Sequence, residues 1–263
     1  MKLHIFHVDA FTDTVFSGNP AAVCPLQHWL RDEVMQKIAL ENMLAETAFF
    51  IPVAGGFAIR WFTPDIEMDL CGHATLASAH VIARHLYPGT KEILFQSRSG
   101  DLTVSAGKKF LTLNFPSRDP QPAQAPQIIL DGFPQEPVEV LKARDYMLVY
   151  EDEDTVRDMK PNRTILDQIN LDPGGIIITA PGKEVDFVSR FFTTQSTNFE
   201  DPVTGSAHCT LIPYWSKRLD KKNLEAYQVS ARGGRLSCAD AGERVLIAGE
   251  AVTYLEGEIN LAL

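Results

Sequence analysis

The chain has 263 residues, of which 45% are hydrophobic and 22% charged, and it carries a formal net charge of −10. This composition is typical of a globular protein with room for one large core or two smaller ones, and it excludes a disordered chain. Because 34 acidic residues outnumber 24 basic ones and no long basic run exists, nucleic acid is not expected as a partner.

Nothing in the sequence points to a membrane or to secretion. No apolar stretch approaches the roughly 20 residues that a membrane span requires, and the first residues lack the basic-then-apolar order of a signal peptide. The four cysteines lie far apart without a CxxC pair, which disfavours a zinc site and a disulfide framework. We therefore expect a cytoplasmic protein with reduced cysteines and no metal.

Strand-like segments alternate with a small number of helices. Strands are expected, in chain order, over 3–11, 47–53, 57–63, 91–97 and 110–115. An amphipathic helix is expected over 28–44, and a helix enclosed by sheet over 74–87, where nearly every face is apolar. In the second half we expect a helix over 161–171 and a counterpart of the enclosed helix over 204–217, which Pro213 should kink or end.

The sequence repeats itself once. Four segments of the first half resemble segments of the second half in the same order: 60–64 and 190–194, 71–80 and 203–212, 97–102 and 231–236, and 106–111 and 241–246. Collinear matches at nearly constant spacing predict two structurally similar halves. We expect these halves over 1–117 and 128–263, joined by a Pro-rich linker over 118–127, with the last strand able to return to the first half.

Several common enzyme folds are excluded. A TIM barrel needs eight strand and helix alternations, and only about four helices are expected here. The motifs GxGxxG after a strand, GxxxxGK[ST] and HExxH are absent. Neither a cofactor nor a metal is therefore expected, and any chemistry should come from side chains.

Glycines precede the two equivalent helices, as Gly72 in CGHAT and Gly205 in DPVTGSAH. Backbone amides at a helix start, together with the helix dipole, favour an anion. We therefore expect a small carboxylate as ligand, bound in a cleft between the two halves. The alternative is that these glycines only let a buried helix begin in a tight space.

Glu46 is the most unusual charge in the chain because apolar residues surround it in NMLAETAFF. A carboxylate that loses hydration has a raised pKa and exchanges protons near neutral pH, as a general acid or base must. The alternative is a glutamate that closes a helix or points out of a sheet edge. His73 suits proton transfer or ligand anchoring. Asp201 either caps the helix that follows it or lies in the cleft beside Ser206 and His208.

Four segments together resemble the PhzF-like family of phenazine biosynthesis, isomerases related in fold to diaminopimelate epimerase. They are VDAFTDTVFSGNPAAV at 8–23, AETAFF at 45–50, the Thr-Pro to CGHAT segment at 63–75 and EDPVTGSAHC at 200–209. The resemblance covers essentially the whole chain. It implies an α+β fold of two pseudosymmetric domains, each a mostly antiparallel, barrel-like sheet around a central apolar helix, with an active site between them and no cofactor.

The resemblance also implies residue roles. It assigns proton transfer to Glu46 with His73 and Asp201 as catalytic partners, and it assigns substrate contacts to Asn19, Gly72, Gly205 and Ser206. The implied reaction relocates a double bond or epimerises a carbon on a small, cyclic carboxylate or amino acid. Ala45 stands where family members often carry serine, so the substrate is expected to differ from that of the phenazine pathway. A homodimer is also expected.

The resemblance adds one comparison, and two alternative functions stay open. Cys71 could occupy the position of one of the two catalytic cysteines of the related epimerases, but no second cysteine matches the other. A hydrolase that uses Ser206, His208 and Asp201 is an alternative, although positions 206 and 208 diverge on a helix and no GxSxG elbow exists. A non-catalytic small-molecule-binding or interaction protein of the same fold is the other alternative.

Overall fold

The computed structural model describes residues 1–172 and 174–261. The chain divides into two compact units. The first unit combines Met1–Asn114 with the C-terminal segment that starts at Ile247, and the second unit is Phe115–Leu246. Both units mix strands with few helices, so the predicted α+β class is confirmed.

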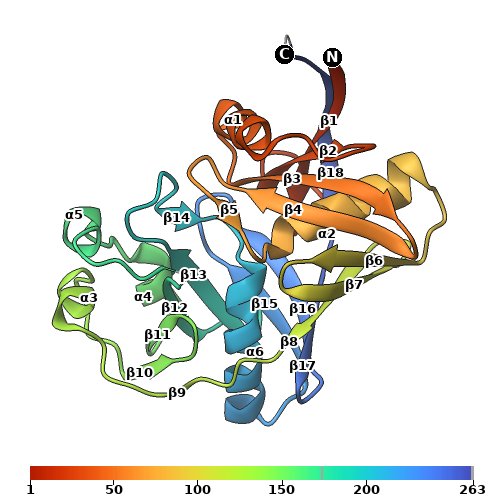
Figure 1. The fold of residues 1–263 in the computed structure, drawn as a ribbon. Coiled ribbons are helices and arrows are strands. Elements are labelled where there is room, and N and C mark those ends of the chain that lie inside the picture. Colours follow the sequence, from red (N-terminus) through yellow and green to blue (C-terminus); the bar gives the residue numbers. More distant parts are fainter. Residues whose placement is uncertain (173, 262–263) are drawn as a thin grey trace. The chain divides into compact units, whose positions relative to one another are not determined.

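The first unit is built on a sheet whose strands are largely consecutive in the chain (Figure 1). Its elements are β1 (Lys2–Ala10), β2 (Asn19–Pro25), α1 (Asp32–Asn42), β3 (Glu46–Val53), β4 (Gly56–Phe62), β5 (Glu67–Met68), α2 (Gly72–Val81), the π-helical turn η1 (Ile82–Leu86), β6 (Glu92–Ser97), β7 (Gly100–Ala106), β8 (Leu111–Pro116) and β18 (Ala251–Asn260). Strand β1 pairs antiparallel with both β18 and β2. The parallel pairs β2–β3 and β4–β6 each need a crossover, which contains α1 and α2 respectively.

Helix α2 is enclosed by strands of its own unit. It contacts β1, β2, β3, β7 and β18, and Figure 1 shows it running beside the first strands of the sheet. Every residue from Gly72 to Ala79 is buried, which is possible because alanine, serine and threonine dominate the helix and the hydroxyls of Thr75 and Ser78 donate back to its own carbonyls. The predicted enclosed helix is thus confirmed.

The second unit repeats this connectivity. Its elements are β9 (Gln121–Pro122), α3 (Gln127–Asp131), β10 (Glu139–Lys142), β11 (Tyr146–Val149), α4 (Glu153–Asp158), α5 (Arg163–Leu166), β12 (Ile176–Pro181), β13 (Phe187–Phe192), β14 (Glu200–Asp201), α6 (Gly205–Leu219), β15 (Asn223–Gln228), β16 (Gly234–Asp240) and β17 (Arg244–Gly249). The parallel pair β11–β12, the antiparallel pair β12–β13 and the parallel pair β13–β15 reproduce β2–β3, β3–β4 and β4–β6.

One ion pair occurs at the same place in both units. Arg60 on β4 donates two hydrogen bonds, of 2.6 and 2.7 Å, to the carboxylate of Glu67 on β5. Arg190 on β13 donates to Glu200 on β14 in the same bidentate way, at 2.6 and 2.9 Å. Because the shared connectivity carries the same side-chain interaction, the duplication predicted from sequence is confirmed.

The main correction to the predicted elements concerns Pro213. Helix α6 continues through Pro213 to Leu219, so of the two effects expected of this proline, a kink or an end, the end does not occur. A proline inside a helix leaves the carbonyl four residues earlier without its N–H partner. Here that carbonyl belongs to Cys209, and the backbone N–H of Arg118 donates to it at 2.9 Å. The segment that follows β8 thus supplies the hydrogen bond that the helix loses at Pro213.

Two other helices are shorter than predicted. Helix α1 begins at Asp32 and not near residue 28, and the segment 161–171 contains only the single turn α5, whose first amides are capped by the side chain of Asn162. All four cysteines are buried and unbridged, as expected. Among the described residues, no helix has the length and apolar character needed to cross a membrane.

Candidate active site

Three chain segments of the first unit begin at one place. Strand β2 starts at Asn19, strand β3 starts at Glu46, and α2 starts at Gly72 after the extended residue Cys71. Because β2 and β3 are parallel neighbours, with Ala21 opposite Glu46, their first residues lie at the same edge of the sheet. The crossover topology therefore brings together side chains that are far apart in sequence.

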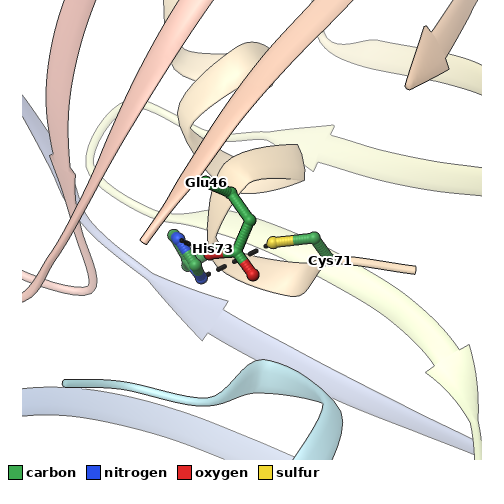
Figure 2. Close-up of side chains that lie close together, drawn as sticks. All are labelled: Glu46, Cys71 and His73. Carbon is green, nitrogen blue, oxygen red and sulfur yellow. Dashed lines mark hydrogen bonds and ion pairs between the residues drawn. The ribbon is translucent and has the colours of Figure 1, made fainter. Parts of the chain in front are cut away.

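The side chains of Glu46 and His73 meet at this edge (Figure 2). His73 Nε2 lies 3.0 Å from Glu46 Oε2, and the two side chains are 3% and 15% exposed. On the other side of the ring, His73 Nδ1 lies 3.0 Å from the Asn19 side-chain nitrogen and 3.6 Å from Cys71 Sγ. The structure thus brings together three of the predicted site residues, Asn19, Glu46 and His73, and adds Cys71 to them.

The neighbours of His73 shift its protonation. Burial alone would lower the pKa of His73, but the Cys71 sulfur and the Glu46 carboxylate beside its two ring nitrogens outweigh burial and raise that pKa well above 6.5. Burial, followed by the Glu46 charge, raises the pKa of the Cys71 thiol to about 11, so this thiol keeps its proton at neutral pH. Because the thiol is protonated there, Glu46 Oε2, 3.0 Å from His73 Nε2, is the neighbouring atom that favours a proton on the His73 ring.

Asn19 can serve either protonation state of His73. With its amide nitrogen facing Nδ1, it supports the neutral ring that carries its proton on Nε2. A protonated ring needs an acceptor at Nδ1 instead, which the same amide supplies by turning its oxygen to that position, since the two amide atoms have nearly the same shape. The position of the ring is thus fixed while its charge changes.

The second unit holds the other predicted site residues around the start of α6. Gly205 is the first helical residue, and Thr204 before it donates its hydroxyl to Asp201 Oδ2 at 2.5 Å. Gln228 donates to the backbone carbonyl of Asp201 at 2.7 Å. Ser206 Oγ accepts a hydrogen bond of 3.1 Å from Arg144 Nη2.

Arg144 was not found by sequence reasoning. Its guanidinium is held by two hydrogen bonds of 3.0 Å to Asp145, which is fully buried and also accepts from the backbone N–H of Gly175. The only sequence signal was an Arg-Asp pair just before the apolar strand β11, and nothing in that pair points to Ser206. The sequence shows Cys71 only as a thiol without a second cysteine to match it, because its proximity to Glu46 depends on how β3 pairs in the sheet.

The two units are not chemically equivalent at these positions. Phe62 pairs with Thr47 and the corresponding Phe192 pairs with Ile176, so the counterpart of Glu46 is Gly175. A Cβ added to Gly175 would lie 2.4 Å from the ring of Phe191, so a side chain does not fit there. Conversely, Asp201 on β14 corresponds to Met68 on β5. The carboxylate of Glu46 thus has no counterpart in the second unit, and the carboxylate of Asp201 has none in the first.

The contacts of His208 disfavour the hydrolase alternative. Its Nδ1 lies 2.8 Å from the carbonyl oxygen of Thr204, and its ring is buried against Phe187. Ser206 Oγ instead receives its hydrogen bond from Arg144. Burial lowers the pKa of His208 to about 4, so this residue is a neutral core histidine.

We expect the pKa values of His73 and His208 to be shifted in opposite directions by folding, so that the two residues have opposite effects on how stability depends on pH. The protonated form of His73 stabilises the fold below pH 6.5, and this contribution is lost as pH rises through its raised pKa. For His208 the folded state binds fewer protons than the unfolded state, so stability is lost as pH falls from about 6.5 toward 4. Histidine NMR, assigned with His73→Asn and His208→Asn, measures both values; a His73 pKa at or below 6.5 would contradict the assignment.

Comparison with known proteins places the chain in a family. The family model described as phenazine biosynthesis-like protein matches residues 8–257. The chain belongs to the PhzF family. It is 47% identical to an uncharacterized isomerase of Pseudomonas aeruginosa over 99% of this chain and 100% of that protein. A solved PhzF-family structure from Enterococcus faecalis is 44% identical, with a TM-score of 0.94 over 99% of this chain and 100% of that one.

The PhzF fold extends to more distant proteins. A hydroxyproline epimerase of Agrobacterium vitis matches with a TM-score of 0.62 at 9% identity, over 98% of this chain and 92% of that one. At this identity the similarity bears on the fold alone. The epimerase-like architecture that the sequence resemblance implied is thus confirmed.

Proposed function

We propose that this PhzF-family protein is an isomerase that moves a proton on a small, cyclic carboxylate or amino acid, with Glu46 as its general acid and base. The observation that carries this proposal is the Glu46–His73 pair at 3.0 Å in a largely buried cluster. The curated relatives that share 47% of its residues are named isomerases, which supports the same reaction class.

The protonation states at the cluster suit proton transfer from carbon. The Glu46 carboxylate takes a proton from the carbon next to the substrate carboxylate, and the C–H electron pair moves into the adjacent π-system. The protonated His73 lies beside Glu46 and stabilises the negative charge that develops on the substrate. Glu46 then returns its proton at another carbon, which relocates a double bond, or to the opposite face of the same carbon after the planar intermediate has turned over, which epimerises that carbon.

Helix starts supply groups for the substrate carboxylate. Neither Cys71 before α2 nor Thr204 before α6 uses its side chain to cap the first turn of its helix, so the amides that begin at Gly72 and Gly205 face no side-chain cap. Arg144 donates into Ser206 Oγ, which leaves the hydroxyl proton of Ser206 for a ligand. We propose substrate contacts for Asn19 and Gly72 in the first unit and for Gly205 and Ser206 in the second, as the family resemblance implies.

A substitution at Asp201 tests whether a carboxylate of the second unit is needed for turnover. Its carboxylate accepts from Thr204, whose position is fixed in turn by Gln228. We expect Asp201→Asn to lower turnover about 10–100-fold with little loss of stability, because an amide of the same size keeps the hydrogen bond to Thr204 and loses only the charge. Asp240→Asn, on β16 of the same unit, serves as the matched control. Equal turnover in both variants would remove Asp201 from the catalytic set.

A direct screen tests the reaction class. Wild-type protein is incubated with a panel of small cyclic carboxylates and amino acids, both unsaturated and saturated, and proton NMR follows double-bond position and configuration. We expect at least one compound to be converted to an isomer of unchanged mass. Conversion with a gain or loss of water, or no conversion in a panel that binds, would contradict the proposed reaction.

A further inference from the structure

Three donor atoms of different chemistry converge where α2 begins. A carboxylate oxygen of Glu46, the sulfur of Cys71 and a ring nitrogen of His73 all lie within 4.8 Å of one another (Figure 2). The proposed isomerase reaction uses Glu46 and His73 but gives no role to Cys71. A sulfur, an imidazole nitrogen and a carboxylate oxygen in one cluster form a donor set that suits zinc and similar transition-metal ions.

We propose that the first unit binds a zinc-class divalent cation through Glu46, Cys71 and His73, and that this cation inhibits the enzyme by occupying its general base. The binding part depends only on the cluster itself. The inhibition part rests on the function proposed above, since it requires Glu46 to be the group that moves the proton.

The spacing of the donors fits a tetrahedral ion after a small adjustment. Bond lengths of about 2.0–2.3 Å to oxygen, nitrogen and sulfur place ligand atoms roughly 3.3–3.8 Å apart in a tetrahedron. The Glu46–His73 contact at 3.0 Å needs to widen slightly, and the widest separation of 4.8 Å or less needs to close by about 1 Å at most. Three protein ligands leave a fourth position for water, as in open zinc sites.

Two features of the cluster favour a bound ligand. His73 Nε2 and Glu46 Oε2 approach each other within ion-pair distance, yet both are buried and neither makes a well-aligned hydrogen bond. The Asn19 amide contacts Nδ1 of His73 and turns Nε2 toward the carboxylate, while Cys71 Sγ, 3.6 Å from Nδ1, has to swing toward Nε2 when an ion binds. Such an outer contact orients a histidine that ligates a metal.

Charge balance supports a divalent cation specifically. Coordination requires the Cys71 thiol to lose its proton, which goes to solvent, so that one thiolate and one carboxylate face the ion. His73 also releases its second ring proton and binds as the neutral imidazole. Two negative ligands then neutralise a charge of +2 in a site where an uncompensated charge would be costly. The Glu46 side chain is 15% exposed, so the cluster reaches solvent at this residue.

Cobalt is the probe that reports on this site directly, because a thiolate bound to Co²⁺ gives a charge-transfer absorption that oxygen and nitrogen ligands do not give. The metal-free, full-length protein is titrated with Co²⁺ and then with Zn²⁺. We expect one Co²⁺ per chain with this absorption, and its loss when Zn²⁺ displaces the cobalt. Cys71→Ser should abolish the absorption and weaken Zn²⁺ binding at least about tenfold. Cys209→Ser, which removes a buried cysteine of α6, should change neither.

The outcomes separate the metal site from the proposed function. If no thiolate absorption develops, or if Cys71→Ser retains it, the metal site is wrong. If the absorption develops but Zn²⁺ does not inhibit an isomerase reaction that the protein demonstrably performs, the inhibitory role is wrong. If the absorption develops and no isomerase activity exists, the proposed function fails while the metal site stands. Circular dichroism of each variant shows that it is folded.

Discussion

Replacing Glu46 with glutamine should lower the isomerase turnover number by about 10²–10⁴-fold, the range that a general acid or base contributes. The amide has nearly the same size and can still contact His73, but it cannot accept a proton from carbon. The substrate should therefore bind with little change while the chemical step slows. Steady-state kinetics on a compound from the substrate screen measures both quantities separately.

Two variants sharpen the test of Glu46. Glu46→Asp keeps the carboxylate but draws it back by one methylene, so its activity should fall between those of the wild type and Glu46→Gln. Glu41→Gln removes an exposed glutamate from the end of α1 and should leave turnover unchanged. Full turnover in Glu46→Gln would contradict the assignment, as would an equal loss in Glu41→Gln.

Replacing Arg190 with methionine should lower the free energy of unfolding by about 2–3 kcal/mol. The side chains of Arg190 and Glu200 are 11% and 25% exposed, so their pair is poorly hydrated. Arg190 also donates to the backbone carbonyl of Met159 at 2.7 Å. The substitution leaves a largely buried carboxylate and an orphaned carbonyl without their donors, which is the costly way to break such a pair.

Urea denaturation measures this loss of stability, provided that the free energy of unfolding depends on urea concentration with the same slope in both proteins. Arg190→Lys keeps the charge but not the two-pronged geometry, so it should recover only part of the loss. Arg163→Met breaks a more exposed pair with Asp167 in the same unit and should cost less than about 1 kcal/mol. If Arg190→Met is no less stable than Arg163→Met, the Arg190–Glu200 pair does not anchor β14, the strand that contains Asp201.

The strands and the enclosed helix could be predicted because their signals are local. Apolar and polar residues alternate in 3–11 and 47–53, and small apolar residues dominate 74–87. Such patterns depend only on which face of a segment is buried, not on which segment lies beside it. The duplication was visible because Arg60 and Arg190 lie within matching segments. Only the partners of these arginines, Glu67 for Arg60 and Glu200 for Arg190, needed the structure.

The assembled cluster could be predicted only in part. The apolar flanks of Glu46 and the helix start at His73 mark two candidates, but their contact depends on the parallel pairing of β2 with β3. Cys71 illustrates the same limit. A search for CxxC spacing finds no metal ligands, because the third donor comes from a strand far away in the sequence.

Pro213 and Arg144 show where local rules stop. A proline inside a helix is disfavoured by a lost hydrogen bond, but the Arg118 amide replaces that bond from another segment. Arg144 reaches Ser206 from the turn before β11, and the buried Asp145 holds it there. Both are long-range interactions that composition and periodicity do not encode.

The most direct test of the central claim is the transfer of solvent deuterium to carbon. Wild-type protein and Glu46→Gln are incubated in D₂O with a converted compound, and NMR locates the label. A carboxylic acid exchanges its proton with water quickly, so the account predicts deuterium at one defined carbon with the wild type and at least about a hundredfold slower incorporation with Glu46→Gln. Isomerisation with equal incorporation by both proteins would show that Glu46 is not the group that moves the proton.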